Sequence, residues 1–317
     1  MTVNVETMAS RLKMRHMSLL VAISDCGTLL KAAERVAISQ PGATKALQEI
    51  ERAFGQQLFD RTNRGLEPNE VGLCAIRYAR LIYTDVINLG KEIEEISKGS
   101  GGHLRIGAIM GAVPFSSNLI SDLVERLPNL KVQFSEGTSL ELLQMLDEGR
   151  LDFAICRISV SSRPEDYVST ELRKERISVI ANKRHPFAQT ADLQLDDLQT
   201  FPWIVCLPDM PMRRHFEREF ANRSVAVPRC LVETASALSL LRLMRQNPRL
   251  CSMQADDVVE ELVGCGELCR LSVSLTSTSE PYFLVYRADR ELSPTARNAI
   301  GSIQNTNDSC AGNLQFR

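Results

Sequence analysis

Residues 28–72, TLLKAAERVAISQPGATKALQEIERAFGQQLFDRTNRGLEPNEVG, decide the fold of the N-terminal part of the chain. Thr28 can cap one short helix, and Ser39 can cap a second helix that has Pro41 in its first turn. The dipeptide Ala37-Ile38 is left for the connection, so the two helices meet at a tight corner. This stretch therefore predicts a helix-turn-helix.

The second helix has two chemically different faces. At about 100° per residue its apolar residues fall in one arc, which we expect to face the core. These residues are Ala43, Ala46, Leu47, Ile50 and Phe54, whereas the opposite arc carries Gln40, Pro41, Thr44, Lys45, Gln48 and Arg52. Gln can pair with adenine, the Thr methyl can contact thymine, and Lys can reach guanine or phosphate in a major groove. A solvated helix face has a similar composition, but the Gln-Pro start after a capped turn, followed by a basic loop, favours DNA binding.

The basic loop follows at residues 60–65, DRTNRG. Asn63 and Gly65 suit a turn, and Arg61 and Arg64 project from its tip, where they can enter a minor groove or bind phosphate. Acidic and basic residues nearly balance over the whole N-terminal part. The position of the cations, and not their number, therefore supports DNA binding.

Residues 73–98 have the period of one long helix. Its apolar positions recur every three or four residues and form a narrow seam. They are Ile76, Ala79, Ile82, Val86, Leu89, Ile93 and Ile96. Such a seam packs either against its own domain or against the same helix of a second copy, and we expect it to support dimerisation. The sequence GSGG at residues 99–102 cannot hold a helix well and predicts a hinge.

Strands and helices alternate after this break. We expect strands at 104–108, 131–135 and 151–155 and helices at 115–127 and 139–148. This order predicts a parallel sheet with helices on both faces, whose ligands bind where strands end and helices begin. A less regular alternation continues over residues 177–286, and the polar residues from Gln304 onward are expected to be loose.

The composition excludes several classes of protein. The chain has 317 residues with 37 Lys and Arg against 39 Asp and Glu, which fits neither global disorder nor a wholly basic nucleic-acid coat. No stretch reaches the ~20 apolar residues of a transmembrane helix, and the N-terminus does not resemble a secretion signal, so we expect a cytoplasmic protein without a membrane partner. Nine scattered cysteines favour reduced thiols, and the close pair Cys265 and Cys269 lacks zinc-site spacing. The motifs of serine hydrolases, nucleotide-binding loops and metalloproteases are missing, so we expect neither an enzyme nor a bound cofactor or metal.

The N-terminal residues resemble those of the LysR-type transcriptional regulators. The matching positions are Ala32-Ala33, Ser39-Gln40-Pro41, Leu47, Ile50-Glu51, Leu58-Phe59, Arg61, Arg64-Gly65 and Gly72. The long helix, the glycine break and the stretches LRIGA (104–108) and DEGRLDFAI (147–155) extend the resemblance to about residues 11–303. The chain departs from the family pattern at Gly42-Ala43 and at Pro68-Asn69-Glu70.

The resemblance implies a winged helix-turn-helix, a linker helix and a two-lobed α/β effector domain of periplasmic-binding-protein type. The expected boundaries are 11–72 for the DNA-binding domain, 73–98 for the dimerisation helix, 102–310 for the effector domain and 306–317 for a flexible tail. Lobe I is expected at about 102–175 and 288–305, and lobe II at about 176–287. The resemblance also implies a homodimer or homotetramer on promoter DNA, with RNA polymerase as a further partner and a small-molecule co-inducer as ligand.

The resemblance and the residue pattern together place the DNA contacts on the helix pair and the wing. They are Thr28, Lys31, Ser39, Gln40, Pro41, Thr44, Lys45, Arg61 and Arg64. The expected effector-binding residues follow strands or begin helices in both lobes. They are Met110, Gly111, Thr138, Ser139, Arg157, Asp209, Met210 and Thr234. Amides and hydroxyls at helix N-termini favour an anionic or polyhydroxy ligand, and Arg157 suits either a ligand contact or a salt bridge at the sheet rim.

One alternative shares the two-lobed body, namely a solute-binding protein without DNA binding. Such a protein would need an export signal and would not begin with a helix-turn-helix. The N-terminal sequence therefore favours the DNA-binding regulator.

Overall fold

The computed structural model describes residues 5–62, 65–97, 101–276 and 279–313. The chain forms two compact units, with the main division between Gly99 and Ser100. Within the described ranges, no helix is both long and apolar enough to cross a membrane. Nor do these residues bring together three or more His, Cys, Asp or Glu side chains that could hold a metal ion.

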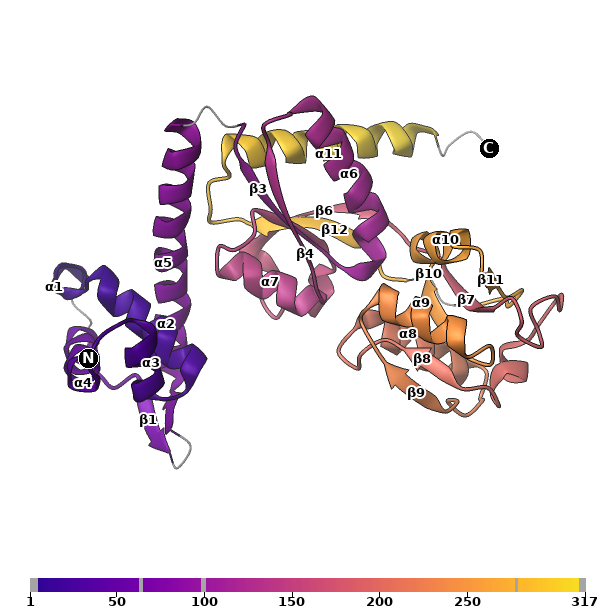
Figure 1. The fold of residues 1–317 in the computed structure, drawn as a ribbon, viewed down its shortest axis with the longest axis horizontal. Coiled ribbons are helices and arrows are strands. Elements are labelled where there is room, and N and C mark those ends of the chain that lie inside the picture. Colours follow the sequence, from indigo (N-terminus) through magenta and orange to yellow (C-terminus); the bar gives the residue numbers. More distant parts are fainter. Residues whose placement is uncertain (1–4, 63–64, 98–100, 277–278, 314–317) are drawn as a thin grey trace. The chain divides into compact units, whose positions relative to one another are not determined.

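The first unit is a helical domain with a two-stranded wing (Figure 1). Its helices are α1 (Val5–Arg11), α2 (Met14–Cys26), α3 (Leu29–Arg35), α4 (Gln40–Phe54) and α5 (Glu70–Ser97), and its strands are β1 (Phe59–Thr62) and β2 (Gly65–Pro68). The two strands pair antiparallel. Helices α3 and α4 form the predicted helix-turn-helix over a core shared with α2 and α5. Helix α1, which the sequence did not predict, contacts α4.

The turn between α3 and α4 is fixed by two caps and one left-handed residue. The Thr28 hydroxyl oxygen accepts the N–H of Lys31 at 3.4 Å, and Ser39 Oγ accepts the N–H of Gly42 at 3.3 Å. Ala37 has a φ of 54°, in the left-handed region that a Cβ disfavours. Both caps are those that the sequence predicted, and each satisfies an amide that the helix itself leaves unpaired.

Helix α5 changes its surroundings along its length. In its first turns Ala75, Ile76 and Ala79 are buried in the core of the first unit. Farther along, the seam consists of exposed residues, namely Ile82, Val86, Leu89 and Ile93, which are 45% to 56% exposed. The start of the seam thus packs against its own domain, while the rest is not covered by the first unit. The side chain of Ile96 lies outside the described part of the chain.

The unusual sequence before α5 provides its cap. Asn69 Oδ1 accepts the N–H of Gly72 at 2.9 Å, and Asn69 Nδ2 donates to the Gln57 carbonyl at 3.0 Å. Asn is among the best N-cap residues, because its short side chain reaches the first free amides of the helix. The departure from the family at this position therefore leaves the start of α5 intact.

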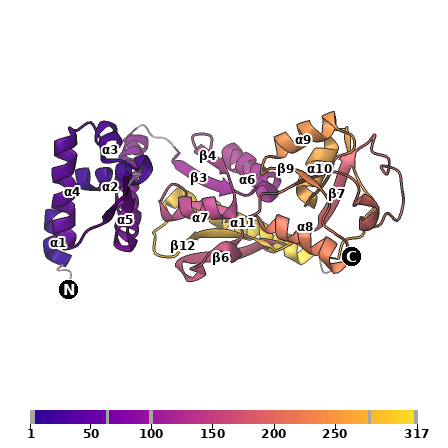
Figure 2. The same cartoon turned by 90° about the horizontal axis from the view of Figure 1, so that it is seen from below.

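The second unit has two lobes, each built on a five-stranded sheet. The strands of lobe I are β3 (His103–Ala108), β4 (Lys131–Glu136), β5 (Phe153–Cys156), β6 (Tyr167–Arg173) and β12 (Tyr282–Arg287), in the order β4-β3-β5-β12-β6. Its helices are α6 (Val113–Arg126), α7 (Ser139–Asp147) and α11 (Pro294–Asn313), with short 3-10 turns η1 (Met110–Ala112), η2 (Ile158–Val160) and η3 (Pro164–Asp166). Helices α7 and α11 lie on opposite sides of the sheet (Figures 1 and 2).

Lobe II repeats this plan with different strands. They are β7 (Ile177–Asn182), β8 (Trp203–Val205), β9 (Cys230–Glu233), β10 (Cys251–Ala255) and β11 (Leu268–Arg270), in the order β11-β7-β10-β8-β9. Its helices are α8 (Pro211–Asn222), α9 (Ala237–Gln246) and α10 (Asp256–Gly264), with the 3-10 turn η4 (Leu195–Leu198). Trp203 packs against Phe216 and Phe220, with ring centroids 5.0 Å and 5.6 Å away, at the centre of a buried core.

Both sheets are mixed, which corrects the expectation of a wholly parallel arrangement. Strands β3, β4 and β5 are parallel as predicted, but β12 runs antiparallel to β5 and β6. In lobe II, β7 runs antiparallel to β10 and β11. A strand that enters a sheet directly from the other lobe needs no helical crossover, so its direction is not constrained to be parallel.

Two expected boundaries also change. Strand β12 belongs to the lobe I sheet, so the chain has returned to lobe I by Tyr282 and not after residue 287. Its hydrophobic residues fill the space between β5 and β6, and its backbone groups find their partners there. Helix α11 continues to Asn313, past Gln304, where a loose tail was expected. No proline interrupts these polar residues, so nothing forces the helix to stop.

Candidate DNA-binding face and effector cleft

The polar face of α4 lies at the surface of the first unit. Gln40, Pro41, Lys45 and Gln48 are exposed, and Thr44 is half-buried. The apolar arc faces inward as predicted, with Ala43, Leu47 and Ile50 buried. Lys45 is exposed and Thr44 keeps part of its surface open, and a helix that reads a groove must present such residues.

The two hydroxyl side chains of this face are already bonded to their own helix. Thr44 Oγ1 donates to the Gln40 carbonyl at 3.0 Å, so the methyl group is what Thr44 can offer to a base edge. The oxygen of Ser39 is used by the cap described above. The exposed side chains of this face that carry other hydrogen-bonding groups are Gln40, Lys45, Gln48 and Arg52.

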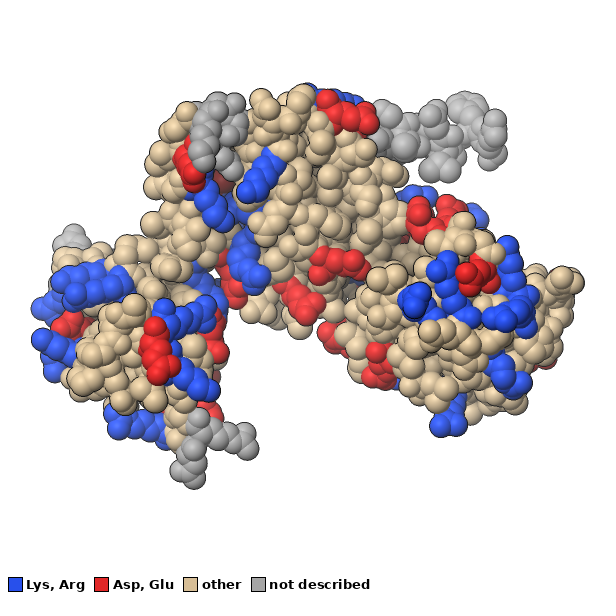
Figure 3. All heavy atoms as spheres, in the orientation of Figure 1, with Lys and Arg blue, Asp and Glu red and all other residues tan. Residues whose placement is uncertain are grey.

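Two of the cations expected to contact DNA from outside α4 lie at the surface of the first unit. Lys31 on α3 and Arg61 on β1 are both exposed, and Arg64 lies outside the described residues. Figure 3 shows Lys and Arg side chains at several places on the visible surface of the first unit, with acidic side chains between them. The visible surface of the first unit thus carries both basic and acidic side chains, as the nearly balanced charge of the N-terminal sequence predicts.

The wing is attached to the turn that precedes α3. Gly65 has a φ of 131°, and a Cβ added there would stand 2.4 Å from the Gly27 carbonyl oxygen. The N–H of Leu66 donates to the same oxygen at 3.0 Å. Glycine is required at this point because the backbone approaches too closely for any side chain. The contact fixes the wing beside the helix-turn-helix.

A cleft opens in the second unit between residues of the two lobes. It encloses about 420 Å³ of empty space, including the part open to solvent. Its lining consists of Ile109, Met110, Gly111, Ser139, Arg157, Glu175, Cys206, Met210, Pro211, Met212, Gln254, Ala255 and Val258. Five of the eight predicted effector residues are among them, namely Met110, Gly111, Ser139, Arg157 and Met210.

The other three predicted residues are not in the lining, and two of them have structural roles. Thr138 Oγ1 accepts the N–H of Glu141 at 3.3 Å, while the Glu141 carboxylate accepts the N–H of Thr138 at 2.7 Å. This reciprocal pair is a capping box that starts α7. Thr234 Oγ1 accepts the N–H of Ser236 at 3.0 Å, so it stabilises the turn before α9. Asp209 lies one residue before Met210 but is not part of the cleft lining.

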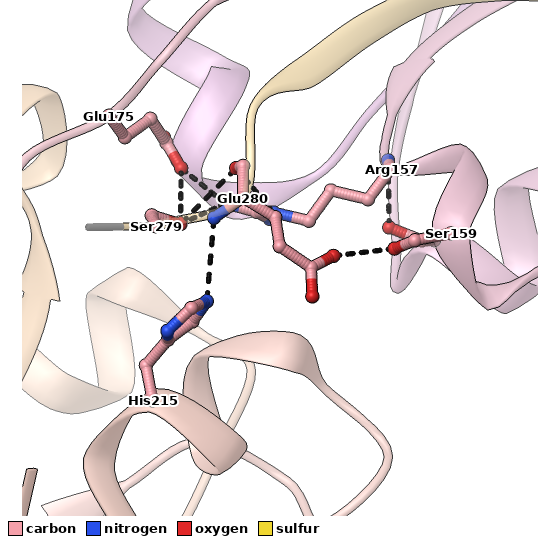
Figure 4. A network of polar contacts seen from close by, with 7 residues as sticks. Arg157, Ser159, Glu175, His215, Ser279 and Glu280 are labelled. Atoms are coloured by element: carbon pink, nitrogen blue, oxygen red, sulfur yellow. Dashed lines mark hydrogen bonds and ion pairs between the residues drawn. The ribbon is translucent and has the colours of Figure 1, made fainter. Parts of the chain in front are cut away.

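Arg157 belongs to a polar network at the junction of the lobes (Figure 4). Its guanidinium forms a buried ion pair with Glu175, and its Nη2 donates to Ser279 Oγ at 3.0 Å. Of the two roles that the sequence left open, the structure thus contains the salt bridge. His215 of α8 completes the network, because its Nε2 accepts the N–H of Glu280 at 3.4 Å. Burial raises the pKa of the Glu175 carboxyl, and the guanidinium of Arg157 opposes this shift.

Sequence reasoning missed two polar residues of the cleft. Gln254 interrupts the buried strand CSMQA, and a polar residue within an apolar strand is a signal that could have found it. Glu175 stands in the charged run RKER, where nothing distinguishes it from a surface residue. Only the fold shows that it is 4% exposed.

Three buried histidines predict how stability depends on pH. His16, His185 and His215 each have a pKa lowered from the ordinary 6.5, mainly by burial. The unfolded chain therefore binds more protons near pH 6 than the folded chain does. Their contribution to stability is complete above about pH 6.5 and is lost as the pH falls through the lowered values.

We expect His185→Gln to make this loss shallower. In urea denaturation between about pH 7 and pH 5, the slope of the unfolding free energy should decrease by up to about 1.4 kcal/mol per pH unit. The variant is also expected to be less stable at pH 7, because His185 packs on Phe201 with ring centroids 4.5 Å apart. An unchanged slope would contradict the assignment of a lowered pKa to His185.

The exposed polar face of α4, the wing and the two-lobed cleft define a DNA-binding regulator with a ligand-binding domain. Residues 14–73 match the family described as bacterial regulatory helix-turn-helix protein, lysR family, and residues 97–307 match the LysR substrate binding domain. The chain belongs to the LysR family of transcriptional regulators. Members of this family are DNA-binding regulators and not enzymes.

The chain is similar to known members over nearly its whole length. It is 30% identical to the HTH-type transcriptional regulator GbpR of Azospirillum brasilense over 301 residues, which cover 94% of this chain and 88% of that protein. It is 26% identical to the HTH-type transcriptional regulator GalR of Pseudomonas putida, over 89% of this chain and 71% of that protein. The crystal structure of CbnR, a LysR family transcriptional regulator, matches with a TM-score of 0.66 and 17% identity, over 93% of this chain and 99% of that one. Full-length CbnR complexed with target DNA matches with a TM-score of 0.64.

Proposed function

We propose that this chain binds promoter DNA as a dimer or tetramer and that a small molecule in the cleft of the second unit modulates this binding. Helix α4 enters the major groove, the wing contacts the backbone or minor groove, and the exposed part of α5 pairs two chains. RNA polymerase is a further partner of the bound complex. The observation that carries the proposal is the exposed amide and ammonium face of a capped helix, held beside a wing in the first unit.

The cleft supports the ligand-dependent part of the proposal. It combines apolar walls with a few polar groups, which is the composition of small-molecule sites. The two effector classes expected from the sequence are anionic and polyhydroxy compounds. The test is a gel shift with DNA upstream of the neighbouring operon at increasing salt, followed by footprinting with a library of small metabolites. Binding without preference for that DNA would contradict the regulator, and a footprint that no library member changes would contradict the role of the cleft.

Gln40 is expected to contribute to the choice of DNA sequence. Gln40→Ala should lose about 1–3 kcal/mol of preference for the operator over unrelated DNA, because a base contact discriminates whereas phosphate contacts do not. Competition gel shifts with both DNAs measure the difference. The matched control is Gln56→Ala, which removes an exposed glutamine just beyond α4. Equal losses on both DNAs would show that Gln40 makes no base-specific contact.

A further inference from the structure

The charges that line the cleft are already paired. Among the described lining residues, Arg157 is the one cation and Glu175 the one carboxylate. Their side chains are 7% and 1% exposed, and they form an ion pair with each other. Figure 4 shows both converging on Ser279 from different segments. The two charges therefore compensate each other before any ligand arrives, and the pair offers an anion no net positive charge.

Both partners nevertheless keep hydrogen-bonding capacity. Glu175 Oε1 is buried and has no hydrogen-bond partner among the described residues. The bonds of Arg157 use Nε, which donates to the Glu280 carbonyl at 3.2 Å, and Nη2, so Nη1 has no partner within the same described part. An unpaired buried acceptor is costly unless a ligand satisfies it. The pair therefore keeps one acceptor, Glu175 Oε1, and one donor, Arg157 Nη1.

Gly111 packs directly against this buried acceptor. A Cβ added at Gly111 would stand 2.6 Å from Glu175 Oε1, so any side chain there would displace or cover the carboxylate. Gly111 itself lines the cleft. Because Gly111 has no side chain, Glu175 Oε1 lies directly against a backbone segment that lines the cleft.

The remaining polar groups of the lining are neutral. Ser139 Oγ accepts the backbone N–H of Arg157 at 3.1 Å, and Gln254 Nε2 donates to Ser252 Oγ at 3.0 Å. The other lining residues are apolar or Cys206, whose thiol pKa is raised by burial to about 11. Within the described lining, no unpaired positive charge is present to replace the hydration that an anion loses on entry.

We propose that the effector is an uncharged polyhydroxy compound and that Glu175 selects it. This inference rests on the proposed function, because it specifies the ligand of the same cleft. One ligand hydroxyl donates to Glu175 Oε1, and another accepts from Arg157 Nη1. A carboxylate beside Oε1 meets the charge of Glu175 at short range, and the guanidinium charge that could offset this repulsion is already shared with Glu175. Repulsion and incomplete desolvation then both oppose its binding.

The test compares ligands that differ in one charged group. The full-length chain is titrated calorimetrically with D-galactose and D-galacturonate, D-glucose and D-glucuronate, and D-mannose and D-mannuronate. Each pair shares its ring and replaces one hydroxymethyl group by a carboxylate. We expect at least one sugar to bind, with a Kd at least about tenfold lower than that of its uronate. A uronate that binds as tightly as its sugar, or the absence of binding by every sugar, would overturn the proposal.

A variant tests whether Glu175 is responsible. Glu175→Gln keeps the size of the side chain and an oxygen that can accept from Arg157, but it removes the negative charge and leaves the guanidinium unneutralised. The ratio of the uronate Kd to the sugar Kd should fall at least about tenfold. Glu165→Gln makes the same chemical change at an exposed position outside the cleft lining and should keep the wild-type ratio. An unchanged ratio in Glu175→Gln would overturn the role of Glu175, and the wild-type comparison decides the ligand class even if this variant does not fold.

Footprinting with the same compounds separates the two proposals. If a carboxylate changes the footprint on the operator and the sugars do not, the uncharged ligand class fails and the proposed function stands. If the chain does not prefer the operator at all, the proposed function fails before the ligand class is reached.

Discussion

Gly72→Ala is expected to destabilise the first unit by about 3 kcal/mol or more. A Cβ at this position would stand 2.0 Å from the Leu58 carbonyl oxygen and 3.2 Å from Pro68 Cβ. Leu58 directly precedes β1 and Pro68 ends β2, so neither can move without breaking the contact between α5 and the wing. Since ~1 kcal/mol shifts the melting temperature of a domain of this size by about 4–8 °C, the loss should exceed about 10 °C. Scanning calorimetry of the full chain measures it.

A second glycine of the same helix provides the control. Gly90 lies in α5 with no atom within 4 Å of an added Cβ. Gly90→Ala should therefore stabilise the helix by about 0.5–1 kcal/mol, since glycine loses more backbone entropy than alanine on folding. If both variants melted at the same temperature, the close approach at Gly72 would not be the constraint that the structure indicates.

Ile93→Glu is expected to weaken self-association by about 100-fold or more. Ile93 is 56% exposed in the single chain and continues the line of Ile82, Val86 and Leu89. If a second chain covers this line, the variant places an unpaired carboxylate in an apolar interface, which costs about 3 kcal/mol or more. Sedimentation velocity at a series of protein concentrations measures the dissociation constant, and operator affinity should fall with it.

The control for this variant lies on the other side of the same helix. Lys91 is exposed and stands about 200° around α5 from Ile93. Lys91→Glu changes the charge by two units yet should leave the sedimentation profile unaltered. Unchanged sedimentation of Ile93→Glu would mean that another surface joins the chains.

The elements of the N-terminal unit could be predicted because their causes are local. Thr28 and Ser39 cap the helices that follow them, and the wheel of α4 separates its buried and exposed residues as expected. The seam of α5 could be recognised, but its change of surroundings could not. The packing of α2 against α5 decides which turns of α5 are covered. The apolar pattern is the same in the covered and the exposed half of the helix, so the pattern alone cannot distinguish them.

The cleft was harder to predict because its residues come from distant parts of the chain. Met110, Ser139 and Met210 were found from their positions after strands or at helix starts. Thr138 and Thr234 followed the same rule, but Thr138 caps α7 and Thr234 stabilises the turn before α9, since a hydroxyl near a helix start satisfies the nearest amide first. Glu175 could not be found, because its partner Arg157 is brought to it only by the mixed sheet and the return of the chain at β12.

The continuity of α5 has a consequence for operator architecture. The helix has 28 residues, and its covered and uncovered turns are joined without a break. Each residue added between them would rotate the far end by about 100° and advance it by about 1.5 Å. If two chains pair through the C-terminal part of α5, the length of this helix sets the distance and the rotation between their two α4 helices on the DNA. Insertions into α5 should then be tolerated in steps near a whole helical turn, and only on operators whose half-sites are respaced to match.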